Sequence, residues 1–224
     1  MLSKEKTMMQ ICLSVFALII TIIAHEIAHG WVAWRLGDNT AQKAGRLSLN
    51  PIKHIDVFGT VILPIILFFS KTGFVFGWAK PVPINYKAFK KTKRDIILVA
   101  SAGIITNIVL AMISVILLKI TFLLPENMIK AILAYFWFNL LLFNTFFAIF
   151  NLLPIPPLDG SKILLGWSDN HRIQYYLNQT RMGLILIIFL AFILPAILQE
   201  FGISFNPLVY LLRHSISFVI NLLL

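Results

Sequence analysis

Two histidines four residues apart, with a glutamate between them, are the residues of this sequence best suited to chemistry. They stand in the motif Ala24-His25-Glu26-Ile27-Ala28-His29-Gly30. On an α-helix, His25 and His29 lie one turn apart on the same face, about 6 Å apart along the axis. Two neutral imidazoles in that arrangement can chelate one Zn²⁺, with Glu26 beside the metal as a general base. The motif therefore predicts zinc-dependent hydrolysis.

This motif lies inside an apolar segment, residues 8–34, that is long enough to cross a bilayer. Ionisable side chains in a membrane segment are costly, and they occur mainly where they face a bundle interior or a water-filled cavity. The simpler alternative is a helix end that carries two interfacial histidines and a glutamate reaching toward the surface. A catalytic zinc needs a third protein ligand, so the rest of the chain decides between these interpretations.

Asp159 is the predicted third ligand. In soluble zinc proteases the third ligand often follows six residues after the second histidine, and that position is Arg35 here. Asp38 and Asp56 lie in a polar loop and are interpreted as solvated turn residues. Asp159 follows several prolines at the end of an apolar segment, next to Gly160, where the backbone can turn back into the bundle. The sequence thus predicts one Zn²⁺ per chain.

The composition predicts a polytopic membrane protein. The 224 residues are 59% hydrophobic and 12% charged, whereas soluble domains are about half apolar and a quarter charged. The net charge of +10 lies mainly between apolar segments, where it is typical of topology determinants and contacts with anionic headgroups. We therefore expect the lipid bilayer, and not nucleic acid, as a partner. The single cysteine, Cys12, excludes a disulfide framework.

The predicted fold is an all-α bundle of about five to six transmembrane helices, with a short β-hairpin and a re-entrant loop after the first span. The strong spans are residues 8–34, 96–118, 129–150, 182–198 and 208–224. Residues 58–69 are short and contain a proline, so they either span or re-enter the membrane. Alternation at 44–49 predicts the edge strand or hairpin, and the Gly- and Pro-rich segment 73–83 predicts the loop. The whole chain, 1–224, forms one domain, with a catalytic core at about 8–165 and accessory helices at about 178–224.

The distribution of basic residues predicts the topology. The clusters at 87–94 and 162–181 should both be cytoplasmic. The two spans between them then run outward and back, and leave Asp159 at the cytoplasmic side. His25 and His29 can meet Asp159 only if the first span also ends there. We expect an integral multi-pass protein of the plasma membrane, with its active site toward the cytoplasm.

Two motifs together resemble the site-2 proteases, the intramembrane zinc metalloproteases of the M50 class. One is the His-Glu-x-x-His motif, and the other runs from Asn151 to Gly160, similar to the family's Asn…Pro-x-x-Pro-Leu-Asp-Gly signature. Segments 45–56 and 77–83 resemble a compact branch without a PDZ domain, and the likeness covers about residues 20–160. The family's Ala-Gly-Pro-x-x-Asn motif occurs at 102–107 without its proline.

This resemblance implies an endopeptidase that cuts membrane-protein substrates in or near a transmembrane segment, in regulated intramembrane proteolysis. By position, the zinc ligands are His25, His29 and Asp159, and the base is Glu26. A substrate helix must unwind locally to expose its peptide bond. We expect the strand at 44–49 to hold the unwound segment by strand addition, and the loop around residue 78 to line or gate access. A homo-oligomer is left open.

Three further polar residues are candidates for binding substrate or the oxyanion. Asn151 could hydrogen-bond the substrate, or it could cap its helix. Asn107 either faces the site or links two helices. His54 either reaches the mouth of the site or is solvated. Two rival functions remain: a metal transporter or channel with an ion path through the same four residues, and a non-catalytic scaffold of the same fold.

Overall fold

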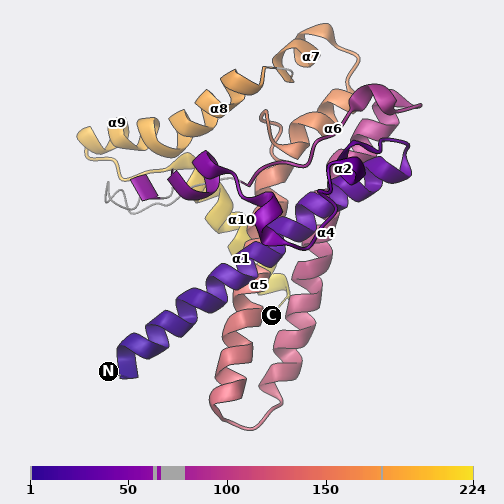
Figure 1. The fold of residues 1–224 in the computed structure, drawn as a ribbon. Helices are drawn as coiled ribbons and strands as arrows, with labels where there is room; N and C mark the ends of the chain where they lie inside the picture. The colour runs from indigo at the N-terminus through magenta and orange to yellow at the C-terminus, as the bar shows by residue number, and fades with distance from the viewer. Residues whose placement is uncertain (1, 63–64, 67–78, 178, 224) are drawn as a thin grey trace.

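The regular structure of this protein is helical. The computed structural model describes residues 2–62, 65–66, 79–177 and 179–223, and these residues form no β-strand (Figure 1). The longer elements are α1 (Leu2–Arg35), α4 (Thr92–Phe122), α5 (Met128–Leu152), α8 (Thr180–Ile188), η4 (Phe189–Ile193), α9 (Leu194–Glu200) and α10 (Pro207–Leu223). The shorter ones are α2 (Thr40–Lys43), η1 (Pro51–His54), η2 (Val57–Ile62), η3 (Tyr86–Ala88), α6 (Asp159–Trp167) and α7 (His171–Leu177).

Four helical segments are long and apolar enough to cross a membrane. They cover residues 7–35, 92–122, 128–152 and 180–200, the last of which joins α8, η4 and α9. The predicted fifth span forms α10, which is apolar but shorter. The prediction of an all-α polytopic membrane protein is therefore confirmed, with four full-length candidate spans among the described residues.

Helices α4 and α5 form a long antiparallel hairpin, and α1 crosses both of them (Figure 1). Ala111 and Val115 of α4 pack against Leu141 of α5, where the two helices are in contact along the hairpin. Ala33 near the end of α1 and Val99 near the start of α4 belong to a second buried cluster. This packing brings the second half of α1 against the first half of α4.

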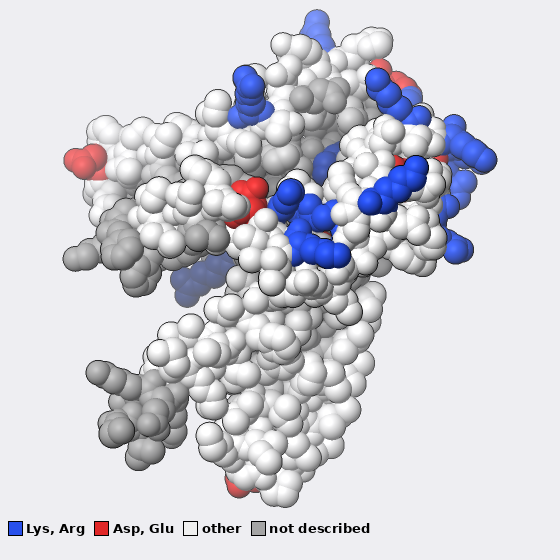
Figure 2. All heavy atoms as spheres, viewed as in Figure 1, with Lys and Arg blue, Asp and Glu red and all other residues white. Residues whose placement is uncertain are grey.

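Basic side chains gather at one end of this assembly. Lys and Arg lie over the region of α2 and the start of α4, whereas the lower part of the α4–α5 hairpin is almost free of charge in the same view (Figure 2). Four of the basic side chains line one hollow beside the start of α4, namely Arg35, Lys90, Lys91 and Arg94. On the face seen in this view, the small number of charges on the lower hairpin and the basic opposite end match the pattern expected of helices that cross the hydrocarbon core and end among headgroups.

The predicted edge strand or hairpin at 44–49 is wrong. The chain turns at Gly45, whose φ of 63° lies in the left-handed region that ends helices such as α2. The Arg46 N–H then donates to Ala41 O at 2.9 Å, and the Asn50 side chain accepts from the Ile52 N–H. Local turns and caps thus use these backbone groups without a partner strand, and an alternation of only six residues was too short to specify one.

The predicted re-entrant loop lies largely outside the described residues. Residues 63–64 and 67–78, which include five of the twelve residues 58–69 and the loop up to residue 78, belong to that part of the chain. After residue 78 the described chain resumes with residues 79–83, which form no regular secondary structure. In this segment the Lys80 N–H donates to His54 O at 2.9 Å. The guanidinium of Arg46 donates to Lys80 O at 2.6 Å. This segment is therefore tied to the region after α2.

Candidate metal centre

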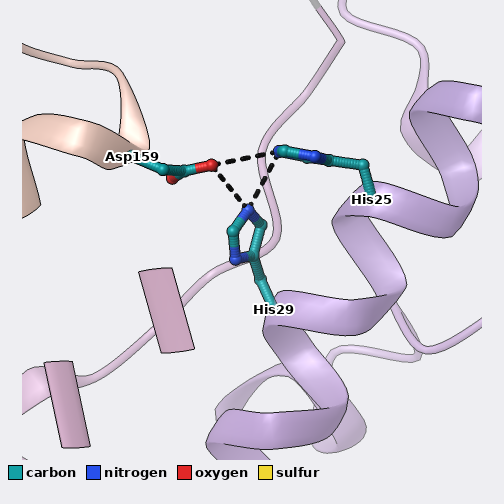
Figure 3. Close-up of side chains that lie close together, drawn as sticks. All are labelled: His25, His29 and Asp159. Atoms are coloured by element: carbon teal, nitrogen blue, oxygen red, sulfur yellow. Dashed lines mark hydrogen bonds and ion pairs between the residues drawn. The ribbon is translucent and has the colours of Figure 1, made fainter. Parts of the chain in front are cut away.

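Three side chains from two distant parts of the sequence converge on one point (Figure 3). His25 Nε2 lies 3.1 Å from Asp159 Oδ2, and His29 Nε2 lies 3.0 Å from the same oxygen. The two Nε2 atoms are 3.0 Å apart. All three residues are at most 5% exposed. Among the described residues they are the one group of His, Cys, Asp and Glu that could hold a metal ion.

Helix α1 supplies both imidazoles because it continues through the motif to Arg35, which puts residues four apart on one face. The ring of His29 is held by Val99 O on α4, 2.7 Å from its Nδ1. A backbone carbonyl only accepts hydrogen bonds, so Nδ1 of His29 carries the hydrogen and Nε2 presents a lone pair. The Nδ1 of His25 lies 2.6 Å from Asn107 Oδ1. Each of the two histidines thus has a partner on α4 that orients its ring, as metal-binding histidines usually have.

Asp159 reaches the same point because α6 begins directly against the end of α5. A Cβ on Gly160 would lie 2.2 Å from Leu152 O, so only glycine permits this close approach. The other carboxylate oxygen, Oδ1, lies 3.1 Å from Lys162 Nζ. Burial lowers the pKa of Lys162, but the charge of Asp159 outweighs it and raises that pKa above its ordinary value. Lys162 therefore stays protonated beside the carboxylate.

The donor set fits a zinc ion. The Oδ2 atom of Asp159 is buried and accepts no hydrogen bond. It faces two Nε2 atoms at 3.0–3.1 Å, so three lone pairs converge where a cation would satisfy all of them. A tetrahedral Zn²⁺ with bonds of ~2.0–2.2 Å separates its ligand atoms by about 3.3–3.6 Å, slightly more than these distances. Two imidazoles and one carboxylate leave a fourth position open, as catalytic zinc sites do.

Helix α4 touches the two rings through a glycine. A Cβ on Gly103 would lie 2.5 Å from His25 Cε1 and from His29 Nε2. Small residues let helices pack closely in membranes, and here the packing partners of Gly103 are the two imidazoles. Helix α4 is also continuous through residues 102–107, as expected without the proline of the family motif.

Glu26, the predicted base, follows His25 on α1 and is half-buried. Its Oε2 accepts a hydrogen bond of 2.8 Å from the Val82 N–H, which lies in the segment 79–83. Val82 also packs against Gly30, one residue beyond the histidine motif. The segment after the undescribed residues therefore orients the glutamate carboxylate.

The three further candidates lie in different surroundings. Asn107 is fully buried, and its amide contacts His25 and Asn144. Asn151 lies in the last turn of α5, where its Nδ2 donates to Phe147 O at 3.1 Å. The ring of His54 is buried and bonds Ser48 O at 2.8 Å, so the structure does not bring it into the cluster.

Asp38 is not the solvated turn residue that the sequence indicated. It is 1% exposed, and it accepts hydrogen bonds from the Thr40 hydroxyl and from the Asn85 N–H. Burial raises the pKa of Asp38, but these hydrogen bonds hold it below its ordinary value. The residue therefore joins the end of α1 to the segment before α4 and is not part of the candidate metal centre.

Two polar residues next to the site were not foreseen. Asn144 on α5 and Thr21 on α1 are both 0% exposed and continue the contacts of Asn107 into the bundle. Thr21 lies one turn before His25, so the helical period that joins the two histidines also includes it. The four-residue spacing of Thr21, His25 and His29 was therefore the sequence signal that could have identified Thr21.

Comparison with known proteins identifies relatives of this chain. The model of peptidase family M50 matches residues 118–195, which include Asp159 but not the two histidines. "Putative zinc metalloprotease YwhC" of Bacillus subtilis is 42% identical over 153 residues, which cover 67% of this chain and 66% of the relative. "Putative zinc metalloprotease Rip2" of Mycolicibacterium smegmatis is 30% identical over 189 residues, 82% of this chain and 67% of the relative. No solved structure gives a significant match.

The chain spans about two thirds of the length of these relatives. Their names agree with the enzyme class and the cofactor predicted from the sequence, a metalloendopeptidase and Zn²⁺, and they confirm both at the level of the family. The identity to the M. smegmatis protein extends over most of this chain, beyond the part that the family model matches. The chain therefore belongs to peptidase family M50, the family whose members include the site-2 proteases.

Proposed function

We propose that this protein is a zinc-dependent intramembrane endopeptidase, which hydrolyses a peptide bond in or near a transmembrane segment of membrane-protein substrates. One observation carries the proposal: His25, His29 and Asp159 converge as a buried three-donor set among helices long and apolar enough to cross a membrane. The Oδ2 atom of Asp159 is buried, has no hydrogen-bond donor and faces two imidazole nitrogens, an arrangement that a bound cation would stabilise. This arrangement supports a metal ion held by these three residues.

In this proposal the histidines and Asp159 hold Zn²⁺, and Glu26 moves the proton. A bound zinc ion supplies a Lewis acid and lowers the pKa of water toward ~7. Glu26 accepts a proton from the attacking water at its carboxylate and delivers it to the leaving amine. The hydrogen bond from the Val82 N–H fixes one of the carboxylate oxygens.

Asn151 is proposed to contact the substrate, since its Nδ2 already donates to its own helix and its carbonyl oxygen can accept a substrate N–H. Its remaining amide hydrogen could serve an oxyanion, with an effect of up to ~3 kcal/mol on the barrier. Substrate helices must unwind before they bind, because their peptide groups are otherwise hydrogen-bonded internally. No strand at 44–49 is available to hold the unwound segment.

We further propose a plasma-membrane location with the active site toward the cytoplasm, and a single domain over the chain. The basic end of the molecule supports this orientation, because Lys and Arg accumulate in cytoplasmic loops. Asp159 lies at the start of α6, beyond the membrane-crossing part of α5. Water can then reach the site from the side on which these charges lie.

A matched pair of glutamate substitutions tests the proposed activity. Glu26→Gln is expected to lower cleavage of a membrane-spanning reporter by roughly 10²- to 10⁴-fold, since the amide cannot accept the proton. Glu126→Gln is the control, because Glu126 is exposed and pairs with Lys130 in the loop between α4 and α5. Cleavage is read from the reporter fragments in membranes or detergent.

Equal cleavage by wild type and Glu26→Gln would refute the mechanism. Absence of cleavage in wild type, combined with zinc-dependent ion flux in vesicles, would instead favour a transporter that uses the same residues.

A further inference from the structure

Buried polar side chains lead from His25 into the interior of the bundle, on the side away from Asp159. Asn107 of α4, Asn144 of α5 and Thr21 of α1 are each 0% exposed. Asn107 Oδ1 lies 2.6 Å from His25 Nδ1, and Asn107 Nδ2 donates to Asn144 Oδ1 at 2.8 Å. Asn144 Nδ2 donates to Thr21 Oγ1 at 2.9 Å. The three helices that surround the site thus meet through one hydrogen-bonded chain.

The direction of each hydrogen bond in this chain is set by a backbone carbonyl. Leu140 O lies 2.8 Å from the Asn144 amide and can only accept, so that side of the amide must be Nδ2. Asn144 therefore turns its Oδ1 toward Asn107, and Asn107 must donate to it through Nδ2. The Oδ1 of Asn107 then faces His25. Since this oxygen also only accepts, Nδ1 of His25 must carry the hydrogen, and Nε2 keeps its lone pair.

No member of the chain can reverse alone. Thr21 donates its hydroxyl hydrogen to Ala17 O at 2.9 Å, so its oxygen is left to accept from Asn144. A flipped amide at Asn107 or Asn144 would place two donors or two acceptors face to face in a buried site. Such unmatched groups are strongly disfavoured away from water.

We propose that Asn107 and Asn144 are positioning residues that fix His25 in the tautomer able to bind the metal through Nε2. This inference rests on the proposed zinc centre and adds to it two residues that touch neither metal nor substrate. We call Asn107 and Asn144 together the relay. His29 needs no relay, because Val99 O accepts directly from its Nδ1. If the Asn107 amide were free to flip, its Nδ2 would favour the other tautomer of His25, whose Nε2–H cannot bind a metal.

The relay is tested by zinc affinity in purified full-length protein, measured by competition with a chromophoric chelator. Asn144→Leu is expected to weaken zinc binding roughly 10- to 100-fold, as the loss of an outer-shell partner does in other metal sites. Asn139→Leu is the matched control, because Asn139 lies on the same helix and also joins α5 to α1, through Ser14. It should change the affinity less than about threefold, since it shares no contact with the relay.

Thr21→Val separates the relay from simple packing. The Asn144 amide remains oriented by Leu140 O in this variant, so zinc affinity should again stay within about threefold of wild type. Wild-type affinity in Asn144→Leu, or an equal loss in Asn139→Leu, would overturn the proposal.

A measurement on wild type covers the case in which Asn144→Leu fails to fold. Nitrogen NMR of zinc-loaded protein with labelled histidine should show His25 and His29 both bound through Nε2 and protonated at Nδ1. Coordination of His25 through Nδ1 would overturn the relay but leave the zinc centre intact. Failure of wild type to bind zinc at all would overturn the proposed function, and the relay with it.

Discussion

Asp159→Asn is expected to weaken zinc binding at least about 100-fold, because outer-shell changes alone cost 10- to 100-fold and this one alters a ligand. The carboxylate oxygen that faces both histidines loses its charge, and the neutral amide is a poor zinc ligand. Lys162, 3.1 Å from the other oxygen, loses its charged partner at the same time.

Thermal unfolding with and without zinc gives the size of this effect. Zinc at about 1,000 times the wild-type dissociation constant should stabilise wild type by about 4 kcal/mol. A variant that binds 100-fold more weakly should gain only about 1.4 kcal/mol at that concentration. Asp169→Asn is the control, since Asp169 is an exposed acid that pairs with Lys93. Equal stabilisation of wild type and Asp159→Asn by zinc would remove Asp159 from the site.

Gly103→Ala is expected to reduce reporter cleavage by about 100-fold or more, although it adds only a methyl group. That methyl would lie 2.5 Å from both imidazoles, so either α4 or the rings must shift. Displacement of catalytic groups by about 1 Å can cost 10²-fold in rate. Overpacking of this kind also costs about 1–3 kcal/mol of stability.

The control for Gly103→Ala adds the same volume to another face of the same helix. Val109 is 47% exposed on α4, so Val109→Ile should leave cleavage and thermal stability near wild type. Parallel measurement of cleavage, zinc content and thermal unfolding separates a displaced site from an unfolded protein. Full activity in Gly103→Ala would show that α4 does not press against the rings as the structure has it.

The convergence of His25, His29 and Asp159 was predictable because each residue carries a strong local signal. Residues four apart on a helix share a face, and Asp159 follows prolines with Gly160 beside it, in a recognisable signature. The membrane spans could likewise be predicted from the lengths of the apolar segments. The meeting of His25, His29 and Asp159 over more than a hundred residues of sequence then followed from the distribution of basic residues and the family resemblance.

The relay was harder to predict from the sequence, because it depends on which faces of three helices meet. Asn107 was expected either to face the site or to link two helices, and its two amide atoms do both. Nothing in the sequence around Asn144 distinguishes it from Asn139, five residues earlier on the same apolar helix. Only packing decides that one lies beside Asn107 and the other beside Ser14.

The edge strand at 44–49 failed for a different reason. Alternation of side chains over a few residues does not identify a neighbouring strand. A strand forms only where another strand pairs with its backbone hydrogen-bonding groups. The glycine at 45 and the asparagine at 50 were the better indicators, since one ends a helix and the other caps the next.

X-ray absorption at the zinc edge of the purified, zinc-loaded protein tests the central claim most directly. The account predicts one zinc per chain, bound by two imidazole nitrogens and by oxygen at ~2.0–2.2 Å, with no sulfur ligand. Asp159→Asn should lose this signal under the same loading. A sulfur shell at ~2.3 Å, or a spectrum without imidazole scattering, would contradict a centre formed by His25, His29 and Asp159.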